Sequence, residues 1–323
     1  MDKRTQAIRA EAARLLAEDI VDVVIGFGTG GLVLKPQPVF LTDADDVGML
    51  IYNGFCQNNL ATYLSRRSPE ERIGILCRGC ESRAIRVLVS EHRHDREDLY
   101  LIGIPCEGIV DWRKAEREAG LGPGAFAEVL TVSEQGDEVL LTTHRGKYRL
   151  QRERILHDSC KRCAYPDPTG TDVMLGEPIG ADAREPRWEP VDAFEALSAE
   201  ERYQSFAQEA ERCIRCYACR EACPMCYCSE CFVDYTTPRW AESMVTPSGT
   251  QAWQIIRAFH QTGRCVGCGA CERACPMDIN MTYLTDRLNR DMLEQYDYEV
   301  GAAEGAQPPF ATFTLDDSER FVR

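Results

Sequence analysis

Seventeen cysteines occur in this chain of 323 residues, and eight of them form two copies of one pattern. The copies are CIRCYACREACP at residues 213–224 and CVGCGACERACP at residues 265–276. Each copy is C-x2-C-x2-C-x3-C-P. A cube of iron and sulfide needs one thiolate on each iron corner, and three cysteines at this spacing let one tight loop reach three corners. The pattern therefore predicts two 4Fe-4S clusters.

The fourth cysteine of each copy points away from its own loop and should complete the other cluster, as in two-cluster ferredoxins. The predicted ligands of the first cluster are Cys213, Cys216, Cys219 and Cys275, and those of the second are Cys265, Cys268, Cys271 and Cys223. Zinc is the alternative metal. Structural zinc sites use two separated C-x2-C pairs and have no use for a third cysteine at the same spacing, so iron–sulfur chemistry is favoured.

A further cysteine-rich stretch, CPMCYCSEC at residues 223–231, follows the first copy. It adds Cys226, Cys228 and Cys231. These residues are either buried thiols, which pack like small hydrophobic side chains, or three ligands of an additional cluster. No fourth ligand is evident nearby in the sequence, and both interpretations stay open.

The N-terminal half contains six more cysteines. Cys56 stands alone in a predicted helix and is expected to be a buried thiol. The other five are Cys77, Cys80, Cys106, Cys160 and Cys163. Cys77 and Cys106 follow predicted buried strands, at the carboxyl edge where α/β sheets build their sites. Four of the five are expected to hold a third 4Fe-4S cluster, with zinc or a redox-active dithiol as alternatives.

Residues 1–165 alternate between helical and strand patterns, which predicts an α/β domain with a mainly parallel sheet. The predicted helices are Arg4–Glu18, Asp43–Tyr63, Arg83–Ser90 and Asp111–Ala119, and the predicted strands are Val21–Ile25, Val39–Leu41, Ile73–Leu76 and Leu99–Ile104. Residues 129–150 read as a β-hairpin. The glycine-rich stretch at residues 26–31 precedes an extended segment, which favours a turn over a nucleotide-binding loop. His92 and His94 are expected at a solvated helix end.

The remainder of the chain is expected to form three parts. Residues 166–200 have the proline-rich composition of a linker. Ser198 and Glu201 form a capping box that begins a helix, and a second helix, Thr250–Gln261, leads into the second cysteine copy. Residues 201–290 are therefore predicted to be an α-helical two-cluster ferredoxin domain, and residues 291–323 an acidic tail with little core.

The overall composition excludes some functions. The formal net charge of -15 makes nucleic acid an improbable ligand, because phosphate neutralisation needs a basic surface. No apolar run approaches the roughly 20 residues that span a bilayer, and the N-terminus lacks the pattern of a signal peptide. A cytoplasmic location without a membrane span is expected, where thiols stay reduced.

Two family resemblances follow from these motifs. The paired cysteine copies with their helical connection resemble the ferredoxin modules of fumarate reductase iron–sulfur subunits and heterodisulfide reductase C subunits. Residues 73–180 resemble the beta subunits of deazaflavin-reducing hydrogenases and formate dehydrogenases, through IGILCRGCESRAI at 73–85, IGIPCEG at 102–108, CKRC at 160–163 and TDVMLGE at 171–177. The second resemblance implies a 4Fe-4S cluster, a flavin such as FAD, electron exchange with a deazaflavin coenzyme, and other redox subunits as partners.

The sequence thus predicts an iron–sulfur electron-transfer subunit of a multisubunit oxidoreductase, related to formate dehydrogenase, hydrogenase or heterodisulfide reductase complexes. It would relay electrons between partner redox subunits, and no catalytic residue is assigned. One alternative is a flavin-dependent reductase that acts on a deazaflavin coenzyme. Another is a zinc-stabilised interaction scaffold.

Overall fold

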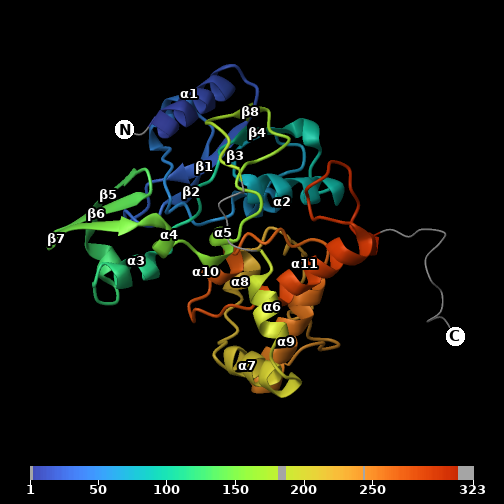
Figure 1. Cartoon of the computed structure of the whole chain (residues 1–323). Helices are drawn as coiled ribbons and strands as arrows, with labels where there is room; N and C mark the ends of the chain where they lie inside the picture. Colours follow the sequence, from blue (N-terminus) through green and yellow to red (C-terminus); the bar gives the residue numbers. More distant parts are fainter. Residues whose placement is uncertain (1–2, 181–186, 243, 312–323) are drawn as a thin grey trace.

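The computed structural model describes residues 3–180, 187–242 and 244–311. Figure 1 shows an α/β lobe built from the N-terminal half and a helical lobe built from the C-terminal half. Within the described ranges, no helix is both long enough and apolar enough to cross a membrane.

The α/β lobe is centred on a five-stranded sheet in the order β2-β1-β3-β4-β8. The strands are β1 (Val23–Gly28), β2 (Gln37–Leu41), β3 (Ile73–Cys77), β4 (Leu99–Gly103) and β8 (Val173–Met174). Only β2 runs antiparallel to its neighbour, and the other pairings are parallel. The predicted fold class, an α/β domain with a mainly parallel sheet, is confirmed.

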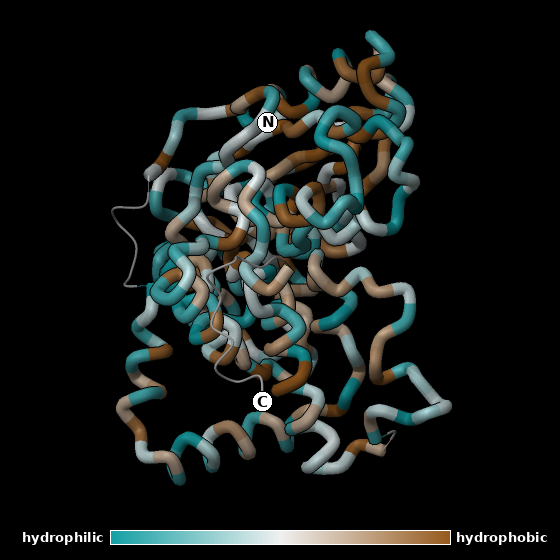
Figure 2. Tube along the Cα trace, turned by 90° about the vertical axis from the view of Figure 1, so that its right-hand side faces the viewer, coloured by the Kyte–Doolittle hydropathy of each residue, from teal (hydrophilic) through white to brown (hydrophobic). Residues whose placement is uncertain are grey.

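Helices α1 (Lys3–Ala17) and α2 (Gly79–Ser90) pack against this sheet. Every residue of β1 and β3 is buried, as expected for strands that are covered on both faces. A Cβ at residue 74 would lie 3.2 Å from Val24 of β1, so glycine avoids crowding between these paired strands. The largest core cluster lies around this sheet, and Figure 2 shows many hydrophobic segments in the upper lobe, which is the α/β lobe of Figure 1.

A second, three-stranded antiparallel sheet forms a side wing of the same lobe (Figure 1). It contains β5 (Val129–Gln135), β6 (Glu138–Thr143) and β7 (Gly146–Gln151), so the predicted hairpin has a third strand. Alternate residues of β6, including Val139 and Leu141, face a core of their own. The short elements around this core are α3 (Trp112–Glu118), η4 (Ala125–Glu128) and α4 (Arg152–Ile155).

The predicted helix Asp43–Tyr63 is wrong. Two 3₁₀ helices, η1 (Ala44–Met49) and η2 (Leu60–Arg66), occupy its ends, with irregular backbone between them. Asp43 and Asn59 each accept a backbone hydrogen bond at the start of one 3₁₀ helix. Asparagine and glycine in the intervening segment favour such local turns over a continuous helix.

His94 also differs from expectation. Its side chain is buried, and its Nε2 atom lies 2.8 Å from the carbonyl oxygen of Leu64. His92 is exposed, as expected, with a positive φ of 55°. The chain continues from there through η3 (Arg96–Asp98) into β4. The glycine-rich stretch belongs to β1 and to the loop leading to β2, so no helix follows it.

Residues 166–200 are more structured than a linker. They supply β8 and, further on, helix α6 (Glu189–Glu195). Asp172 secures β8, because its carboxylate accepts a hydrogen bond of 2.7 Å from the backbone N–H of Leu101. This short edge strand was not predicted, because the proline-rich composition of the segment indicated a linker. Helix α5 (Asp158–Lys161) lies just before this segment.

The helical lobe contains α7 (Ala199–Glu211), α8 (Ala218–Glu221), α9 (Pro247–His260), α10 (Ala270–Arg273) and α11 (Thr282–Tyr296). The capping box of Ser198 and Glu201 begins α7 as predicted. Helix α9 packs against both α7 and α11, and α11 also packs against α6. The short helices α8 and α10 follow the two cysteine loops and contact each other.

The predicted acidic tail begins instead with packed structure. Helix α11 continues to Tyr296, and Tyr298 and Val300 are buried against the core of the α/β lobe. Arg83 of α2 donates a 2.8 Å hydrogen bond to the carbonyl oxygen of Val300. The turn η5 (Pro309–Ala311) ends the described chain, and residues 312–323 of the predicted tail lie outside the described residues.

Candidate metal centres

The two cysteine loops of the helical lobe share one backbone conformation. Arg215 and Tyr217 of the first loop have φ angles of 50° and 60°, and Gly267 and Gly269 at the equivalent positions of the second have 68° and 67°. The left-handed conformation costs a non-glycine residue roughly 1–2 kcal/mol. Arg215 stabilises the first loop, because its guanidinium donates a 2.9 Å hydrogen bond to the carbonyl oxygen of Met244.

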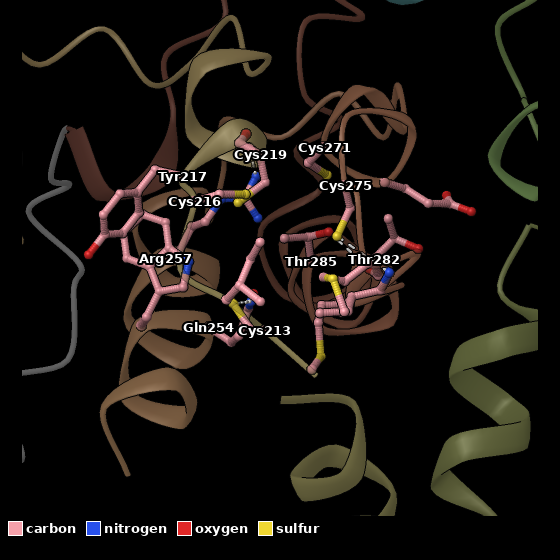
Figure 3. Close-up of a pocket in the computed structure, with 16 residues that line it drawn as sticks. Cys213, Cys216, Tyr217, Cys219, Gln254, Arg257, Cys271, Cys275, Thr282 and Thr285 are labelled. Carbon is pink, nitrogen blue, oxygen red and sulfur yellow. Dashed lines mark hydrogen bonds between the residues drawn. The ribbon is translucent and has the colours of Figure 1, made fainter. Parts of the chain in front are cut away.

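The structure brings Cys213, Cys216 and Cys219 together with Cys275 of the other loop; we call these four residues set 1. They line one cavity of about 40 Å³ (Figure 3). The backbone N–H of Arg215 and the side-chain amide of Gln254 donate to the sulfur of Cys213, at 3.4 and 3.6 Å. Hydrogen bonds to sulfur and convergent cysteines are the environment that iron–sulfur clusters use. This placement supports the predicted crossed ligation.

Cys223 and the second loop form a corresponding group, Cys265, Cys268, Cys271 and Cys223, which we call set 2. Burial, followed by the neighbouring thiols of Cys223 and Cys268, raises the pKa of Cys265 to about 12. Burial likewise raises the pKa of Cys219 in set 1 to about 11. Such thiols keep their protons at neutral pH, so a metal must displace them when it binds.

Cys271 joins the two sets. It belongs to set 2 by sequence, yet it also lines the cavity of set 1. Arg257 of α9 lines the same cavity and approaches sulfurs of both sets. The two predicted clusters would therefore be neighbours.

Four of the five N-terminal cysteines lie where three segments meet. Cys80 is at the start of α2, Cys106 follows β4, and Cys160 and Cys163 lie in and just after α5; these four residues form set 3. Burial is the main reason that the pKa of the Cys80 thiol is raised, and Cys163 lies close enough to contribute. Burial also raises the pKa of Cys106, Arg78 opposes that shift, and Cys160 adds to it.

The backbone geometry allows the three segments that carry set 3 to approach one another. A Cβ on residue 79 would lie 1.9 Å from the carbonyl oxygen of Tyr165, so glycine is required where the segment after Cys163 crosses the start of α2. The N–H groups of Gly108 and Ile109 point at sulfur, at 3.4 Å from Cys106 and 3.3 Å from Cys160. The four sulfurs of set 3 and the N–H groups that point at them therefore suit an iron–sulfur cluster.

Cys77 lies apart from set 3. It ends β3, is fully buried, and belongs to the hydrophobic core. Burial raises its pKa, and no other thiol is among the groups that shift it. Cys56 is also fully buried, as predicted, although its backbone forms a turn; burial raises its pKa to about 12.

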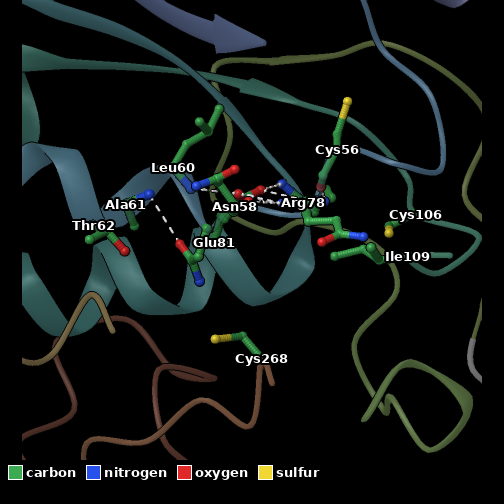
Figure 4. Close-up of polar contacts among 12 residues, drawn as sticks. Cys56, Asn58, Leu60, Ala61, Thr62, Arg78, Glu81, Cys106, Ile109 and Cys268 are labelled. Carbon is green, nitrogen blue, oxygen red and sulfur yellow. Dashed lines mark hydrogen bonds and ion pairs between the residues drawn. The ribbon is translucent and has the colours of Figure 1, made fainter. Parts of the chain in front are cut away.

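An ion pair that sequence reasoning missed holds set 3 in place. Arg78 and Glu81 are 2% and 1% exposed, and their closest oxygen and nitrogen atoms are 2.7 Å apart. Glu81 also accepts a 2.8 Å hydrogen bond from the N–H of Leu60 (Figure 4). The pair ties the start of α2, and so Cys80, to the segment before η2. In the sequence, the feature that could have indicated this pair is an arginine three residues before a glutamate at the start of a helix.

Set 3 borders on set 2. Cys268 lies close enough to Cys80 to affect its pKa, and Figure 4 shows Cys268 below α2. A Cβ on residue 269 would lie 2.2 Å from the hydroxyl of Ser159, next to Cys160. The second cysteine loop therefore packs directly on α5. The order of the three groups is set 3, set 2, set 1.

Cys226, Cys228 and Cys231 line another cavity, of about 640 Å³.

Within residues 3–180, 187–242 and 244–311, no three His, Cys, Asp or Glu side chains are arranged to hold a single metal ion. The cysteine sets are recognised by shared cavities, hydrogen bonds and electrostatic contacts. Their assignment as cluster ligands stays a prediction.

Known proteins resemble this chain over nearly its whole length. A model of the 4Fe-4S dicluster domain matches residues 209–300. The F420-dependent formate dehydrogenase subunit beta of Methanocaldococcus jannaschii is 24% identical, across 94% of this chain and 93% of that protein. The F420-dependent formate dehydrogenase 1 subunit beta of Methanococcus maripaludis is also 24% identical, across 94% and 92%.

Among solved structures, a chain of the F420-reducing [NiFe] hydrogenase complex from Methanosarcina barkeri aligns with a TM-score of 0.40 and 17% identity, covering 50% of this chain and 59% of that one. The sequence relatives extend across both lobes, and the domain model covers both cysteine loops. Across most of its length this chain is thus similar to F420-dependent formate dehydrogenase beta subunits, and its residues 209–300 match a 4Fe-4S dicluster domain.

Proposed function

We propose that this chain is a cytoplasmic electron-transfer subunit that relays electrons between redox subunits of a larger oxidoreductase. The partners would be formate dehydrogenase, hydrogenase or heterodisulfide-reductase-like subunits. The observation that carries the proposal is the continuous order of set 3, set 2 and set 1 across both lobes. Clusters at these positions would form a path, because electron transfer between cofactors requires that they be close together.

The two ends of this path lie in different lobes. Set 3 lies between the α/β lobe and the second cysteine loop, with Cys160 buried and its other members partly buried, whereas Cys216 of set 1 is exposed. One partner would exchange electrons near set 3, and another near Cys216. The clusters supply one-electron chemistry, and the protein's part is to position them and set their potentials through hydrogen bonds, charge and burial.

The interface between the lobes supports a fixed path. Arg273 of α10 donates a 2.9 Å hydrogen bond to the carbonyl oxygen of Gln57. Thr62 donates one of 3.0 Å to the carbonyl oxygen of Ala222, just before Cys223. Arg113 donates one of 3.2 Å to the carbonyl oxygen of Cys275. Each bond links the α/β lobe to a cysteine-bearing segment, so the segments that carry sets 1 and 2 are held on the lobe that carries set 3.

The relay is tested with anaerobically purified full-length chain. Substoichiometric reductant should distribute electrons over several clusters, as seen by EPR, while the isolated chain shows no formate or hydrogen turnover. The matched control is Cys56→Ser, which lies outside every set and should leave the spectrum unchanged. Complete substrate turnover by the isolated chain would contradict a pure relay.

A second candidate function, a flavin-dependent reductase, is favoured by a polar groove between the lobes. The groove has a volume of about 470 Å³ and lies between η2 and the helices α8 and α10. Asn59 and Arg273 line it and are 2% and 8% exposed. The Asn59 Nδ2 and Arg273 Nη2 atoms find no hydrogen-bond partner among the described residues.

Buried donors without partners are costly, so this groove suits a ligand with several acceptor oxygens. The carbonyl-bearing ring or the phosphates of a flavin meet that description, and α8 and α10 each carry a cysteine of the dicluster domain. Purified chain should then contain about one flavin, and Asn59→Leu should release it while the iron content is retained. Chain that neither contains nor takes up flavin would rule out this function.

A further inference from the structure

The segment that follows Cys223 forms one wall of the largest of the cavities described above. Cys226, Cys228 and Cys231 all line it, opposite the end of helix α9. Cys228 is exposed and the other two are partly buried. Three thiols within six residues that face one cavity are unusual for a core that merely packs, because a packing thiol has no need of a shared cavity.

The setting of these thiols is cationic. Four arginines line the cavity against two carboxylates, Glu221 and Asp234; the arginines are Arg66, Arg220, Arg257 and Arg264. Gln261 is 3% exposed and donates from its side-chain amide to the sulfur of Cys226, at 3.4 Å. Hydrogen bonds of this kind stabilise thiolates and sulfur-bridged metal clusters.

Arg257 provides a second, independent observation. It is 7% exposed and lines both this cavity and the cavity of set 1. Its Nη2 atom donates to the carbonyl oxygen of Cys219, at 3.4 Å, its Nε atom has no hydrogen-bond partner within the described part of the chain, and no ion pair with a carboxylate is seen for it there. A buried cation without an anion is expensive. Negative charge on both sides of α9 would balance it, and thiolate-ligated clusters carry such charge.

A fourth donor is available in the same cavity. His260, at the end of α9, lines it, and the His260 ring packs edge-on against Phe232 with 5.2 Å between the ring centroids. The two carboxylates that line the cavity are engaged in ion pairs, Asp234 with Arg220 and Glu221 with Arg66, so we do not assign either of them as a ligand. Imidazole nitrogen replaces thiolate as an iron ligand in some iron–sulfur proteins.

We propose that Cys226, Cys228 and Cys231 hold a fourth iron–sulfur cluster, with His260 as its remaining ligand. On assembly each thiol gives its proton to solvent and forms a sulfur–iron bond. The side-chain amide of Gln261 lies between the sulfurs of Cys226 and Cys223, donating to Cys226 at 3.4 Å and accepting from Cys223 at 3.6 Å, so the new site adjoins set 2. The cluster would then accept one electron from set 2 and pass it on without making or breaking a bond. Its role in the relay rests on the proposed function, whereas its existence does not.

The proposal is tested first on the unaltered chain, purified anaerobically with its metals. Iron, sulfide and zinc are measured, and the folded protein is treated with iodoacetamide before peptide mapping. A four-cluster chain contains about 16 iron atoms, and Cys228 should resist alkylation until a chelator removes the iron. Rapid alkylation of Cys228 in iron-loaded protein would overturn the proposal. About 12 iron atoms with normal relay would leave the proposed function standing and remove only the fourth cluster.

Variants of the proposed ligands test whether the fourth cluster lies at this site. Replacing Cys226, Cys228 and Cys231 together by serine should remove about four iron atoms and four sulfides, whereas the control Cys56→Ser should remove none. Because Cys226 contacts Cys223, the single variant Cys228→Ser serves if the triple variant fails to fold. Unchanged iron in both, or loss of one zinc instead, would contradict the cluster. His260→Ala should alter the EPR signal of the fourth cluster only, and an unaltered signal would exclude His260 as its ligand.

Discussion

We predict two roles for cysteine in this chain, and the neighbours of each sulfur distinguish them. Cys56 and Cys77 are surrounded by the hydrophobic core, whereas the cysteines of the three sets have other cysteines beside them. Burial raises the pKa of thiols of both kinds, so burial alone does not identify a ligand. We therefore assign ligands from the proximity of several sulfurs.

Cys80→Ser should therefore remove about four iron atoms, because set 3 then lacks a thiolate. Cys77→Ala should leave the iron content unchanged and cost about 1 kcal/mol of stability, through a small core cavity. Iron analysis and thermal unfolding of the two variants check this. Equal loss of iron from the two variants would mean that Cys77 is a ligand in place of one of the other three cysteines of set 3.

Arg257 should influence the reduction potentials of the clusters beside it. A buried cation stabilises the reduced, more negative core, so Arg257→Gln should lower the midpoint potential of set 1, on the order of tens of millivolts. Arg257→Lys keeps the charge and should shift it less. Potentiometric titration followed by EPR measures both, and an unchanged midpoint in the glutamine variant would contradict this role.

Asp286 of α11 should make stability depend on pH. Burial raises its pKa from 3.8 to about 6, although Arg162 and Arg187 oppose the shift. The folded protein therefore binds a proton that the unfolded chain has released, and stability from this group is lost as the pH rises through 6. Asp286→Asn should stabilise the protein at pH 8, by on the order of 2 kcal/mol.

This gain should shrink as the pH falls from 8 to 5, because the wild-type carboxyl is then increasingly protonated in the folded state. Urea unfolding across that range measures it. A gain that grows on acidification would show that Asp286 is instead stabilised in its ionised form.

At the scale of elements, α2 connects the two lobes. Its first turn carries Cys80 and the Arg78–Glu81 pair, and its next turn carries Arg83, which is 4% exposed. Arg83 donates hydrogen bonds to the carbonyl oxygens of Val266 and Val300, at 3.1 and 2.8 Å. One helix thus positions set 3 and clamps the second cysteine loop beside it.

Arg83→Ala should destabilise the chain by about 3 kcal/mol, because it leaves the buried carbonyl groups of Val266 and Val300 without their donor and removes one of the two arginines that pair with Glu299. The matched control is Arg66→Ala, which removes an exposed ion pair with Glu221 between the same lobes and should cost under about 1 kcal/mol. Chemical unfolding compares them. Similar costs for both would mean that the buried clamp contributes little.

The elements that sequence patterns predicted are those whose signals are local. The alternation of helices and strands, the capping box of Ser198 and the paired cysteine loops each lie within a few residues. The failures depend on distant contacts. The segment after Asp43 is shaped by the bond from Leu60 to Glu81, β8 by Asp172 and Leu101, and the end of α11 by Arg83. The choice of four cysteines over five in set 3 likewise required the spatial position of Cys77.

At the scale of the molecule, the proposed function makes the two lobes one electron path. The α/β lobe supplies set 3, the dicluster domain supplies sets 1 and 2, and the second cysteine loop packs between them. The strongly acidic surface, with a net charge of -15, suits docking to basic patches on partner subunits. Complex formation should therefore weaken as ionic strength increases.

The most direct test of the relay is EPR spectroscopy of the fully reduced chain, prepared anaerobically, together with its iron and sulfide content. Neighbouring clusters couple magnetically when both are reduced. The account predicts at least about 12 iron atoms per chain and a spectrum broadened by interaction between clusters, which simplifies in Cys80→Ser. A folded chain that contains zinc without iron, or clusters that give only isolated, non-interacting signals, would contradict it.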